Sequence, residues 1–397
     1  MSTSNSPPLV PIVRPSFDDA EAAAVANVVR SGWLMQGPQV QAFESALAAY
    51  LGNGQSEPSV VAVSNGTAAL ELALRALHIG PGDEVVTVSH SFIATANCIL
   101  AVGATPVFVD VQSDGLTMDP TQVQSALCPK TKAILCVHQL GHACDLEALL
   151  AIASRAGIPL VEDAACALGT EILLSQTWQR VGRPAGTIAC FSFHPRKVIT
   201  TGEGGAISTN DTALADRIRL LRQHAIPVAS AAPNPDLPDG YTVPAFNARM
   251  TDMSAAIGLA QLAKLPLLLA ERRSQADSLH KQLAGNSVLA PAPQSTFERP
   301  NWQSYAARIR AESRLSSAQI LSFLKQQGIS ARGGLTNAHE EPAYTDSPSQ
   351  WRAGSLCTSE RLRREVIMLP IFPGLTLAEK DQLAAALKAL GSQAPSP

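Results

Sequence analysis

Short apolar segments alternate with helix-periodic segments through the first two-thirds of the chain, and this alternation most limits its possible folds. The strand-sized apolar segments lie at residues 84–88, 106–111, 133–137, 159–161 and 188–193. Helical spacing of apolar residues predicts helices at 38–52, 66–78 and 145–156. Buried strands that alternate with helices predict an α/β fold with a mostly parallel sheet.

The pattern changes after about residue 262. A long helix is predicted at 265–283 and a strand at 304–309. Two capping-box patterns, Ser316 with Gln319 and Thr376 with Glu379, precede helical runs at 320–327 and 380–390. We therefore expect a large domain at residues 1–262 and a smaller α+β domain at 263–397, with N-terminal residues contributing to the smaller one.

Composition excludes several classes of protein. Charged residues make up 16% of the 397 residues and the net charge is −3, so a surface that follows nucleic-acid phosphates is not expected. The seven cysteines form no CxxC pair, so neither a disulfide framework nor a metal site is expected. The chain shows no signal-peptide core and no apolar run of about 20 residues, which predicts a cytoplasmic protein.

Two motifs follow predicted strands at the edge of the sheet where ligands bind in open α/β folds. In the first, Gly66 and Thr67 open a predicted helix, so backbone N–H groups there can hold a phosphate or simply form a helix cap. In the second, Asp163 ends a buried strand, where it can bind a cofactor nitrogen, a metal or a ribose, or cap the next helix. The residues alone leave these alternatives open.

Lys197 is the third feature. It follows the apolar segment 188–193 and precedes the glycine-rich Thr-Gly-Glu-Gly-Gly at 201–205. Burial disfavours a protonated amine, and an uncharged amine is what a Schiff-base nucleophile needs. A nicotinamide enzyme is the main alternative, but no GxGxxG motif stands at a strand–helix junction.

These motifs, with others in the same order, resemble the DegT/DnrJ/EryC1/StrS aminotransferases. The matching stretches are 31–33, 37–38, 64–70, 81–85, 103–110, 131–134, 162–165, 191–197, 201–205 and 247–252. The resemblance implies a fold-type-I enzyme that depends on pyridoxal 5′-phosphate (PLP), with a large domain built on a mostly parallel seven-stranded sheet and a smaller α+β domain. It also implies a homodimer with active sites shared across the interface.

The resemblance implies a role for each matching residue. Lys197 binds PLP covalently and moves the substrate proton, and Asp163 pairs with the pyridine nitrogen. Gly66, Thr67 and Ser192 bind the cofactor phosphate, and Phe92 stacks on the ring unless it is simply a core residue. Asn247 enters the phosphate site of the neighbouring subunit, accompanied by Arg249 or with Arg249 in a surface ion pair.

Several positions depart from the family pattern. Cys166 stands where the family carries Gln or His against the cofactor's phenolic oxygen, and a thiol bonds weakly there. Residues 173–183 look like an insertion, and 332–339 lacks a histidine-rich pattern that is common on the substrate side. His138, His90 and His194 also lie near strand ends, and we expect each to be a buried histidine with satisfied hydrogen bonds.

The resemblance predicts a transaminase that cycles between PLP and its amine form, PMP. The amino donor is an amino acid, L-glutamate by family habit, and the acceptor is a keto substrate, most often a nucleotide-linked keto sugar. A cyclitol or other small carbonyl acceptor and a PLP-dependent dehydratase are alternatives, although Lys197 argues against the dehydratases that carry histidine there. A non-catalytic regulatory protein is the alternative from another class, and the Lys197–Asp163 pair argues against it.

Overall fold

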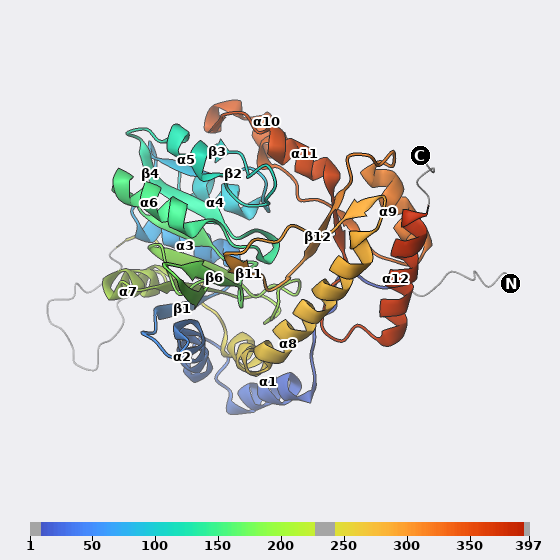
Figure 1. Cartoon of the computed structure of the whole chain (residues 1–397). Helices are drawn as coiled ribbons and strands as arrows, with labels where there is room; N and C mark the ends of the chain where they lie inside the picture. The colour runs from blue at the N-terminus through green and yellow to red at the C-terminus, as the bar shows by residue number, and fades with distance from the viewer. Residues whose placement is uncertain (1–8, 227–242, 393–397) are drawn as a thin grey trace, which may run out of the picture.

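The computed structural model describes residues 9–226 and 243–392, and its centre is a sheet of eight strands (Figure 1). From edge to edge the strands are β1 (Ser59–Val63), β9 (Gly205–Thr209), β8 (Ile188–Ser192), β5 (Leu160–Asp163), β4 (Thr131–Val137), β2 (Glu84–Val88), β3 (Thr105–Val109) and β14 (Arg352–Ala353). β9 runs antiparallel to both neighbours and the other adjacent pairs are parallel. The expected mostly parallel sheet is confirmed, with β14 as an added eighth strand.

The sequence patterns predict five of these strands and miss β1 and β9 at one edge. β9 begins at Gly205 and has Ile207 as its only large apolar residue, so its sequence resembles a turn more than a strand. β1 is as apolar as the predicted strands, and its run of valines could have indicated it.

Helices cover both faces of the sheet. α3 (Gly66–Ala76), α4 (Ala94–Ala101) and α7 (Thr212–Leu221) pack on one face, and α2 (Pro38–Gly52), α5 (Pro120–Ala126), α6 (Leu146–Ala156) and α8 (Asp252–Ala284) pack on the other. Successive side chains of a strand point to opposite faces. In β1, Val61 and Val63 accordingly join the α3 side, whereas Val60 and Ala62 join the α2 side. Both layers exclude water from the strands, which leaves the strand ends as the place for polar groups.

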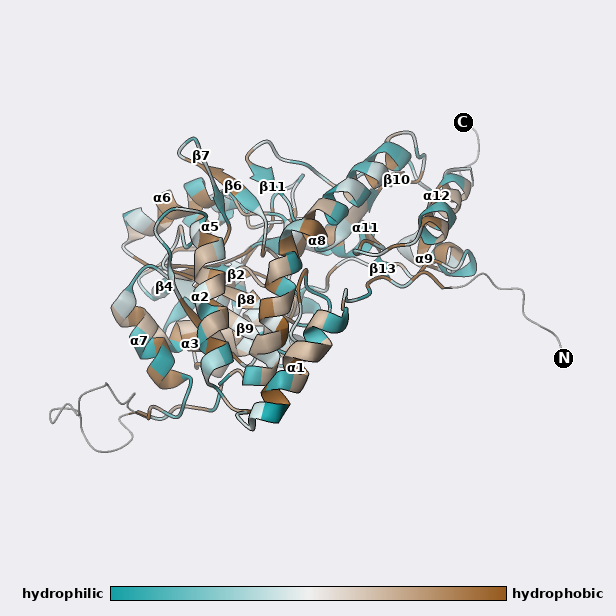
Figure 2. Cartoon of the chain, turned by 90° about the horizontal axis from the view of Figure 1, so that it is seen from below, coloured by the Kyte–Doolittle hydropathy of each residue, from teal (hydrophilic) through white to brown (hydrophobic). Residues whose placement is uncertain are grey.

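The long helix α8 differs from its prediction. It was expected at residues 265–283 but runs from Asp252 to Ala284, capped by the side chain of Thr251. Pro266 lies inside it, and proline removes a single backbone donor there, so neighbouring packing can hold the helix together. α1 (Asp19–Ser31) and α2 lie beside α8 in Figure 2. The expected domain boundary at residue 262 therefore falls within a continuous helix, and the division into two domains stays a prediction.

α8 is also the one helix in the described part of the chain that could cross a membrane by length and composition. Its most apolar window has a mean hydropathy of 1.6, and 44% of that window is buried inside the protein. A core helix of a soluble protein passes the same test, so this is weak support for a membrane span.

A second sheet organises the C-terminal third. Its strands, in order, are β10 (Leu289–Ala290), β12 (Tyr305–Ile309), β15 (Val366–Leu369) and β13 (Arg332–Gly333), all antiparallel. α9 (Ser317–Gln326) and α12 (Leu377–Gly391) share its apolar core, and both begin with the predicted capping boxes. Val10 belongs to this core and pairs with Ile329, as expected for a contribution from the N-terminal residues.

The C-terminal third returns to the far edge of the main sheet. It does so through the short helices α10 (Pro342–Thr345) and α11 (Cys357–Glu365), the single-turn segments Ala338–Glu340 and Pro348–Gln350, and β14. β14 pairs with β3, and Trp351 and Tyr344 pack their rings around Phe108 of β3. The C-terminal third is thus joined to the main sheet at this edge as well as through α8.

The segment 173–183, expected to be an insertion, belongs to a β-hairpin. Its strands are β6 (Glu171–Leu174) and β7 (Thr177–Arg180), and β11 (Glu298–Arg299) extends them into a three-stranded sheet. Ser175 and Gln176 at the turn both have positive φ, 46° and 64°, which suits a tight two-residue turn. A further single turn, Gln139–Gly141, follows β4.

Asp252 supplies a helix cap that the sequence of α2 lacks. α2 starts after Gly37, which has no side chain to cap it, and the buried Asp252 carboxylate accepts N–H bonds from Gly37 at 2.8 Å, Val40 at 3.0 Å and Gln39 at 3.1 Å. We expect Asp252→Ala to lower the free energy of unfolding by about 3 kcal/mol, because three backbone donors, one of them buried, lose their charged acceptor. Urea unfolding measures this. Asp277→Ala, on an exposed position of the same helix, is the control, and equal losses in both variants would contradict the capping role.

Candidate active site

A cavity of about 1000 Å³ opens at the ends of β4, β5 and β8. One wall comes from the main sheet and the start of α3, and the other includes Arg332, Met368 and Ile371 from the C-terminal third. All eight residues expected in the site line this cavity: Gly66, Thr67, Phe92, Asp163, Cys166, Ser192, Lys197 and Asn247. The fold therefore brings together residues that are up to 181 positions apart, from Gly66 to Asn247.

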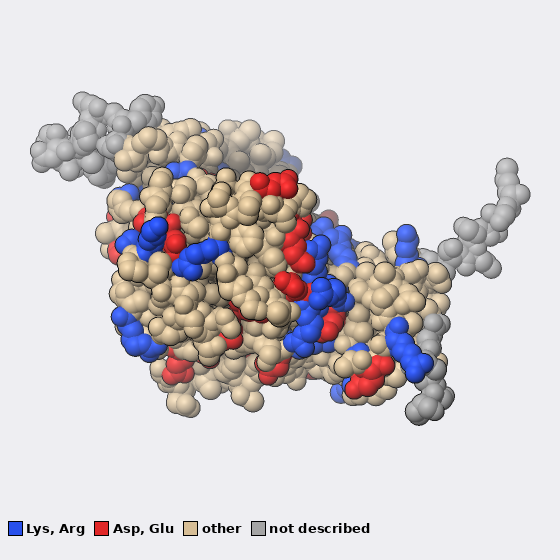
Figure 3. Space-filling model, turned by 90° about the horizontal axis from the view of Figure 1, so that it is seen from above, with Lys and Arg blue, Asp and Glu red and all other residues tan. Residues whose placement is uncertain are grey.

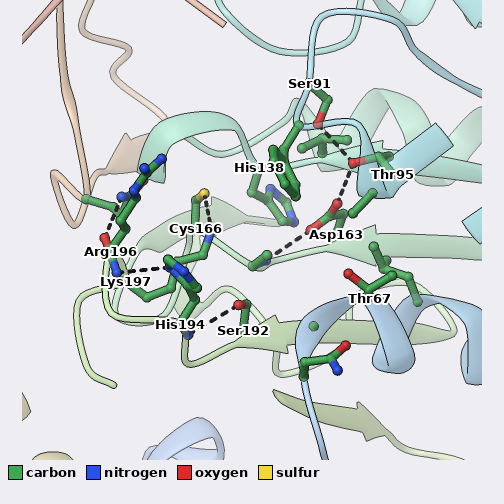
Figure 4. Close-up of a pocket in the computed structure, with 18 of the residues that line it drawn as sticks. Thr67, Ser91, Thr95, His138, Asp163, Cys166, Ser192, His194, Arg196 and Lys197 are labelled. Atoms are coloured by element: carbon green, nitrogen blue, oxygen red, sulfur yellow. Dashed lines mark hydrogen bonds between the residues drawn. The ribbon is translucent and has the colours of Figure 1, made fainter. Parts of the chain in front are cut away.

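Asp163 is the last residue of β5 and its side chain is held from two directions. Its Oδ2 accepts a bond from the Thr95 hydroxyl at 2.8 Å, and its Oδ1 accepts the N–H of Ala165 at 3.1 Å. Thr95 in turn lies 2.9 Å from the hydroxyl of Ser91, so the three side chains form the line visible in Figure 4. Because the Thr95 proton goes to the carboxylate, Ser91 is the donor to Thr95.

Burial decides the charge preference of Asp163. The side chain is buried, and desolvation raises its pKa above the ordinary 3.8, although the Thr95 and Ala165 bonds oppose that rise. Among the described residues, Asp163 has no cation within ion-pair distance. A cationic group that entered the cavity beside it would therefore find an unpaired, oriented carboxylate.

Lys197 lies across the cavity from the Thr95–Asp163 pair. It follows β8 in a turn closed by its N–H to the carbonyl of His194, 2.8 Å away. Its amine donates to the sulfur of Cys166 at 3.1 Å, as Figure 4 shows. Cys166 thus contacts the lysine itself, a contact that the sequence did not predict.

The start of α3 approaches the ends of β8 and β9 closely. A Cβ placed on Gly66 would lie 2.7 Å from the Cβ of Ser192, and one on Gly205 would lie 2.5 Å from the Asn65 carbonyl oxygen. The Asn65 side chain caps the helix by accepting the Ala68 N–H at 2.8 Å. The N–H groups of Gly66 and Thr67 have no partner within the helix and face the cavity region, as in an anion site.

Phe92 and Asn247 lie at the exposed rim of the cavity. Phe92 is 69% exposed, and this exposure excludes the alternative that it is a core residue. Asn247 is exposed and its Oδ1 accepts the N–H of Arg249 at 3.3 Å. Arg249 itself pairs through its backbone with Val63 of β1. A single chain thus places Asn247 beside its own cavity, and its role toward a neighbouring subunit stays a prediction.

His138 is buried, as expected. Its Nδ1 accepts the Cys144 N–H at 3.1 Å, so Nε2 carries the proton and donates to Glu162 at 3.0 Å. Glu162 also accepts the N–H groups of Ala185 and Gly186, so it is fully bonded within the protein. Of these two neighbouring acids, Glu162 is used by hydrogen bonds within the protein, and only Asp163 lines the cavity.

The other two histidines, His90 and His194, differ in their burial. His90 is buried, as expected, with Nδ1 2.8 Å from the Asn337 amide oxygen. His194 is only half-buried and lines the cavity, so the expectation of a buried histidine is wrong at this position. It follows the end of β8 directly, where the chain leaves the protected sheet. Burial still lowers its pKa, while Glu203 opposes this and Lys197 adds to it.

Comparisons with known proteins agree over the whole chain. The model of the DegT/DnrJ/EryC1/StrS aminotransferase family matches residues 15–388. DesV from S. venezuelae, solved with a ketimine intermediate, is 32% identical with a TM-score of 0.85, over 98% of this chain and 100% of that one. Spr1654 from Streptococcus pneumoniae, solved in its PMP form, is 28% identical with a TM-score of 0.86, over 97% and 99%. PseC from Helicobacter pylori, an aminotransferase involved in pseudoaminic acid biosynthesis, is 26% identical with a TM-score of 0.86, over 97% and 100%.

The buried carboxylate predicts a stability gain when its charge is removed. Because the pKa of Asp163 is raised, the folded protein binds more protons than the unfolded chain between pH 3.8 and the raised value, and stability falls as pH rises through this range. We expect Asp163→Asn to stabilise the cofactor-free protein near pH 8, because the amide carries no charge that burial disfavours. The gain should shrink as the pH falls toward 3.8.

Urea unfolding at several pH values measures this effect. Asp216→Asn, at a side chain that is 75% exposed, is the control and should change stability little at any pH. A destabilised Asp163→Asn variant near pH 8 would show that the carboxylate is better satisfied than its burial suggests.

Proposed function

This chain belongs to the DegT/DnrJ/EryC1/StrS aminotransferase family, and on this basis we propose that it is a PLP-dependent enzyme acting on a nucleotide-linked keto sugar. L-glutamate is the proposed amino donor. The observation that carries the proposal is the opening of three groups onto one cavity: the Lys197 amine, the Asp163 carboxylate and the start of α3. Spr1654, a relative of similar fold that is described as a sugar aminotransferase, supports the sugar substrate.

The residues of the cavity fit PLP. The close approach of Gly66 to Ser192 leaves helix N–H groups and two hydroxyls, those of Thr67 and Ser192, for a phosphate. Asp163 is a buried carboxylate without a counter-charge, which suits a protonated ring nitrogen. Phe92, exposed at the rim, offers a face for stacking on the ring. When bound, PLP supplies an electron sink for the pair left by breaking the donor's Cα–H bond.

The protein's own groups then do the rest. Lys197 accepts the proton from the donor's Cα and returns it at the neighbouring position, so that one amine acts as base and then as acid. The hydrogen bonds from Thr95 and Ala165 fix the direction of the Asp163 carboxylate. Cys166 stands where the family carries Gln or His against the cofactor's phenolic oxygen, and in this chain its sulfur lies 3.1 Å from the Lys197 amine, so that it helps to position that amine. The walls of the cavity exclude bulk water from the proton that moves.

A homodimer in the cytoplasm is part of the same proposal. Large apolar side chains are exposed in two places: Trp33, Leu34 and Met35 at 54%, 45% and 58%, and Phe246, which lines the cavity, at 55%. Apolar groups exposed together mark surfaces that another molecule covers. We infer that a second copy of the chain covers them and brings its Asn247 to the phosphate site.

Replacing Lys197 tests the central assignment. We expect the wild-type protein with PLP to show a visible absorbance band, and borohydride to fix the cofactor mass on the peptide that contains Lys197. Lys197→Ala should lose this labelling and roughly 10³-fold or more in transamination rate, because both the covalent anchor and the proton carrier are gone. Lys132→Ala, on an exposed lysine of β4, should change neither. Full activity in Lys197→Ala would refute the assignment.

Two further variants, at Asp163 and Cys166, test which of these side chains matters more for the cofactor ring. Asp163→Asn should cost far more transamination rate than Cys166→Ser, since only Asp163 carries a charge that can pair with the ring nitrogen. Single-turnover kinetics with L-glutamate measures both. Equal and small losses would show that Asp163 does not contact the ring.

Hybrid dimers test whether the site is shared. We expect a dimer of one Lys197→Ala chain and one Asn247→Ala chain to hold one intact site, with Lys197 from one chain and Asn247 from the other. Its activity should reach about half that of the wild type, well above either homodimer, by the symmetry of a two-fold interface. If Asn247 serves its own chain, each site of the hybrid carries a defect, and the activity stays at the level of the homodimers.

A further inference from the structure

A second cavity, of about 900 Å³, lies entirely in the C-terminal third. Its lining comes from residue 290, the end of β12 and the loop after it, the first turns of α9, and α11. It shares no lining residue with the active-site cavity. Whatever this cavity binds therefore does not enter the transamination described above.

Positive charge dominates the lining. Five arginines line this cavity with two glutamates, Glu312 and Glu365, although the whole chain carries a net charge of −3. We call the five the arginine groove: Arg308, Arg310, Arg361, Arg363 and Arg364. Figure 3, which looks down on the side where α11 lies, shows Lys and Arg side chains gathered in one place with a few Asp and Glu among them. The local charge is thus opposite in sign to that of the protein.

Most of this charge is not neutralised within the described residues. Arg310 donates to the carbonyls of Asn286, Leu283 and Ala284 at the end of α8, and no carboxylate pairs with it. Arg361 donates to the carbonyl of Ser113 at 2.9 Å and reaches Glu365 only at 3.9 Å. Among the five arginines only Arg363 has a close carboxylate, Glu340 at 2.9 Å.

Arg308 and Arg364 have no ion pair in the described part of the chain. The guanidinium of Arg308 donates to the carbonyl of Gly115 at 2.7 Å, while its Nε is buried without a partner. Burial lowers the pKa of Arg308 and the neighbouring Arg361 lowers it further, while Asp114 and Glu365 oppose this shift without forming an ion pair with Arg308. Gathering like charges in this way costs free energy unless an anion offsets it.

Helix α9 adds uncharged donors to the same cavity. In its capping box the Ser316 hydroxyl accepts the N–H of Gln319 at 3.3 Å. The N–H groups of the first two helical residues, Ser317 and Ala318, are left without helical partners. Both residues line the same cavity as the arginines. The positive end of α9 therefore lies at the same cavity as the five arginines.

The remaining lining is apolar. Ile309, Leu315, Leu321 and Ala290 complete the cavity between the charged groups. Guanidinium groups bind phosphate through paired N–H bonds and also stack on flat rings. From this combination we propose that the arginine groove is a binding site for a small organic molecule that carries two or more phosphate groups.

Two sources of this chemistry are inorganic pyrophosphate and a nucleoside diphosphate. The apolar lining would contact only the second, so adenosine diphosphate (ADP) should bind more tightly than pyrophosphate. The site is independent of the proposed transamination, because its residues are absent from the active-site cavity.

Calorimetric titration of the intact, PLP-loaded protein at low salt tests the proposal. We expect ADP to bind, and the double variant Arg361→Gln/Arg364→Gln to weaken that binding by roughly tenfold or more, because charge-assisted bonds to phosphate are lost. Both side chains lie on the outer part of α11, so the fold should be kept, and a thermal unfolding curve checks this. Arg30→Gln, on an exposed arginine of α1 far along the chain, is the matched control and should bind as the wild type does.

The results of this titration distinguish a nucleoside diphosphate from inorganic pyrophosphate as the ligand. ADP tighter than pyrophosphate, with both weakened in the double variant, supports an organic phosphate ligand. Equal binding of both probes overturns the organic part of the proposal. Binding that the double variant leaves unchanged places the ligand elsewhere, and no binding by the wild type removes the site altogether. Because transaminase activity is measured separately, none of these results bears on the function of Lys197.

Discussion

The close approach of two backbones at the start of α3 is the constraint on which the active site depends. Gly66 and Gly205 let the helix and the β8–β9 pair come nearer than any side chain would allow. Without that contact, Ser192 would not stand beside the helix N–H groups. The turn that carries Lys197 continues directly from the same strand, so the distance between the anion site and the amine is set by the sheet and not by a flexible loop.

The end of β5 carries two carboxylates, one bonded within the protein and one that lines the cavity. Glu162 and Asp163 are adjacent, and their side chains point to opposite sides of the strand. Glu162 meets His138 and two backbone N–H groups, which satisfies it inside the protein. Asp163 receives only partial support from Thr95 and Ala165, so it retains a desolvation cost that a cationic partner can offset. A site of this kind gains its chemistry at the expense of the stability of the empty protein.

Much of the fold and of the candidate site could be predicted from the sequence, because strand ends and glycine-rich turns have recognisable local sequence patterns. The positions of Asp163 and Lys197 followed from their places after apolar segments. Ser91, in the segment before α4, and Thr95, on α4, were missed because a single hydroxyl gives no pattern that marks it as the partner of a distant carboxylate. The start of α8 was misplaced because Pro266 resembles a helix beginning, whereas packing against α1 and α2 carries the helix through it. The arginine groove was invisible because its members come from two segments, 308–310 and 361–364, that meet only in the fold.

The strand β14 has a mechanical consequence. A cleft between two bodies that are joined at one point can open like a hinge. Here the C-terminal third is attached to the main sheet both through α8 and through the β14–β3 pair, where Trp351 and Tyr344 pack around Phe108. A rigid-body rotation about α8 would have to tear that strand pair and its aromatic packing apart. Ligands must then enter the cavity by rearrangement of side chains and loops at its rim, while its walls stay in place.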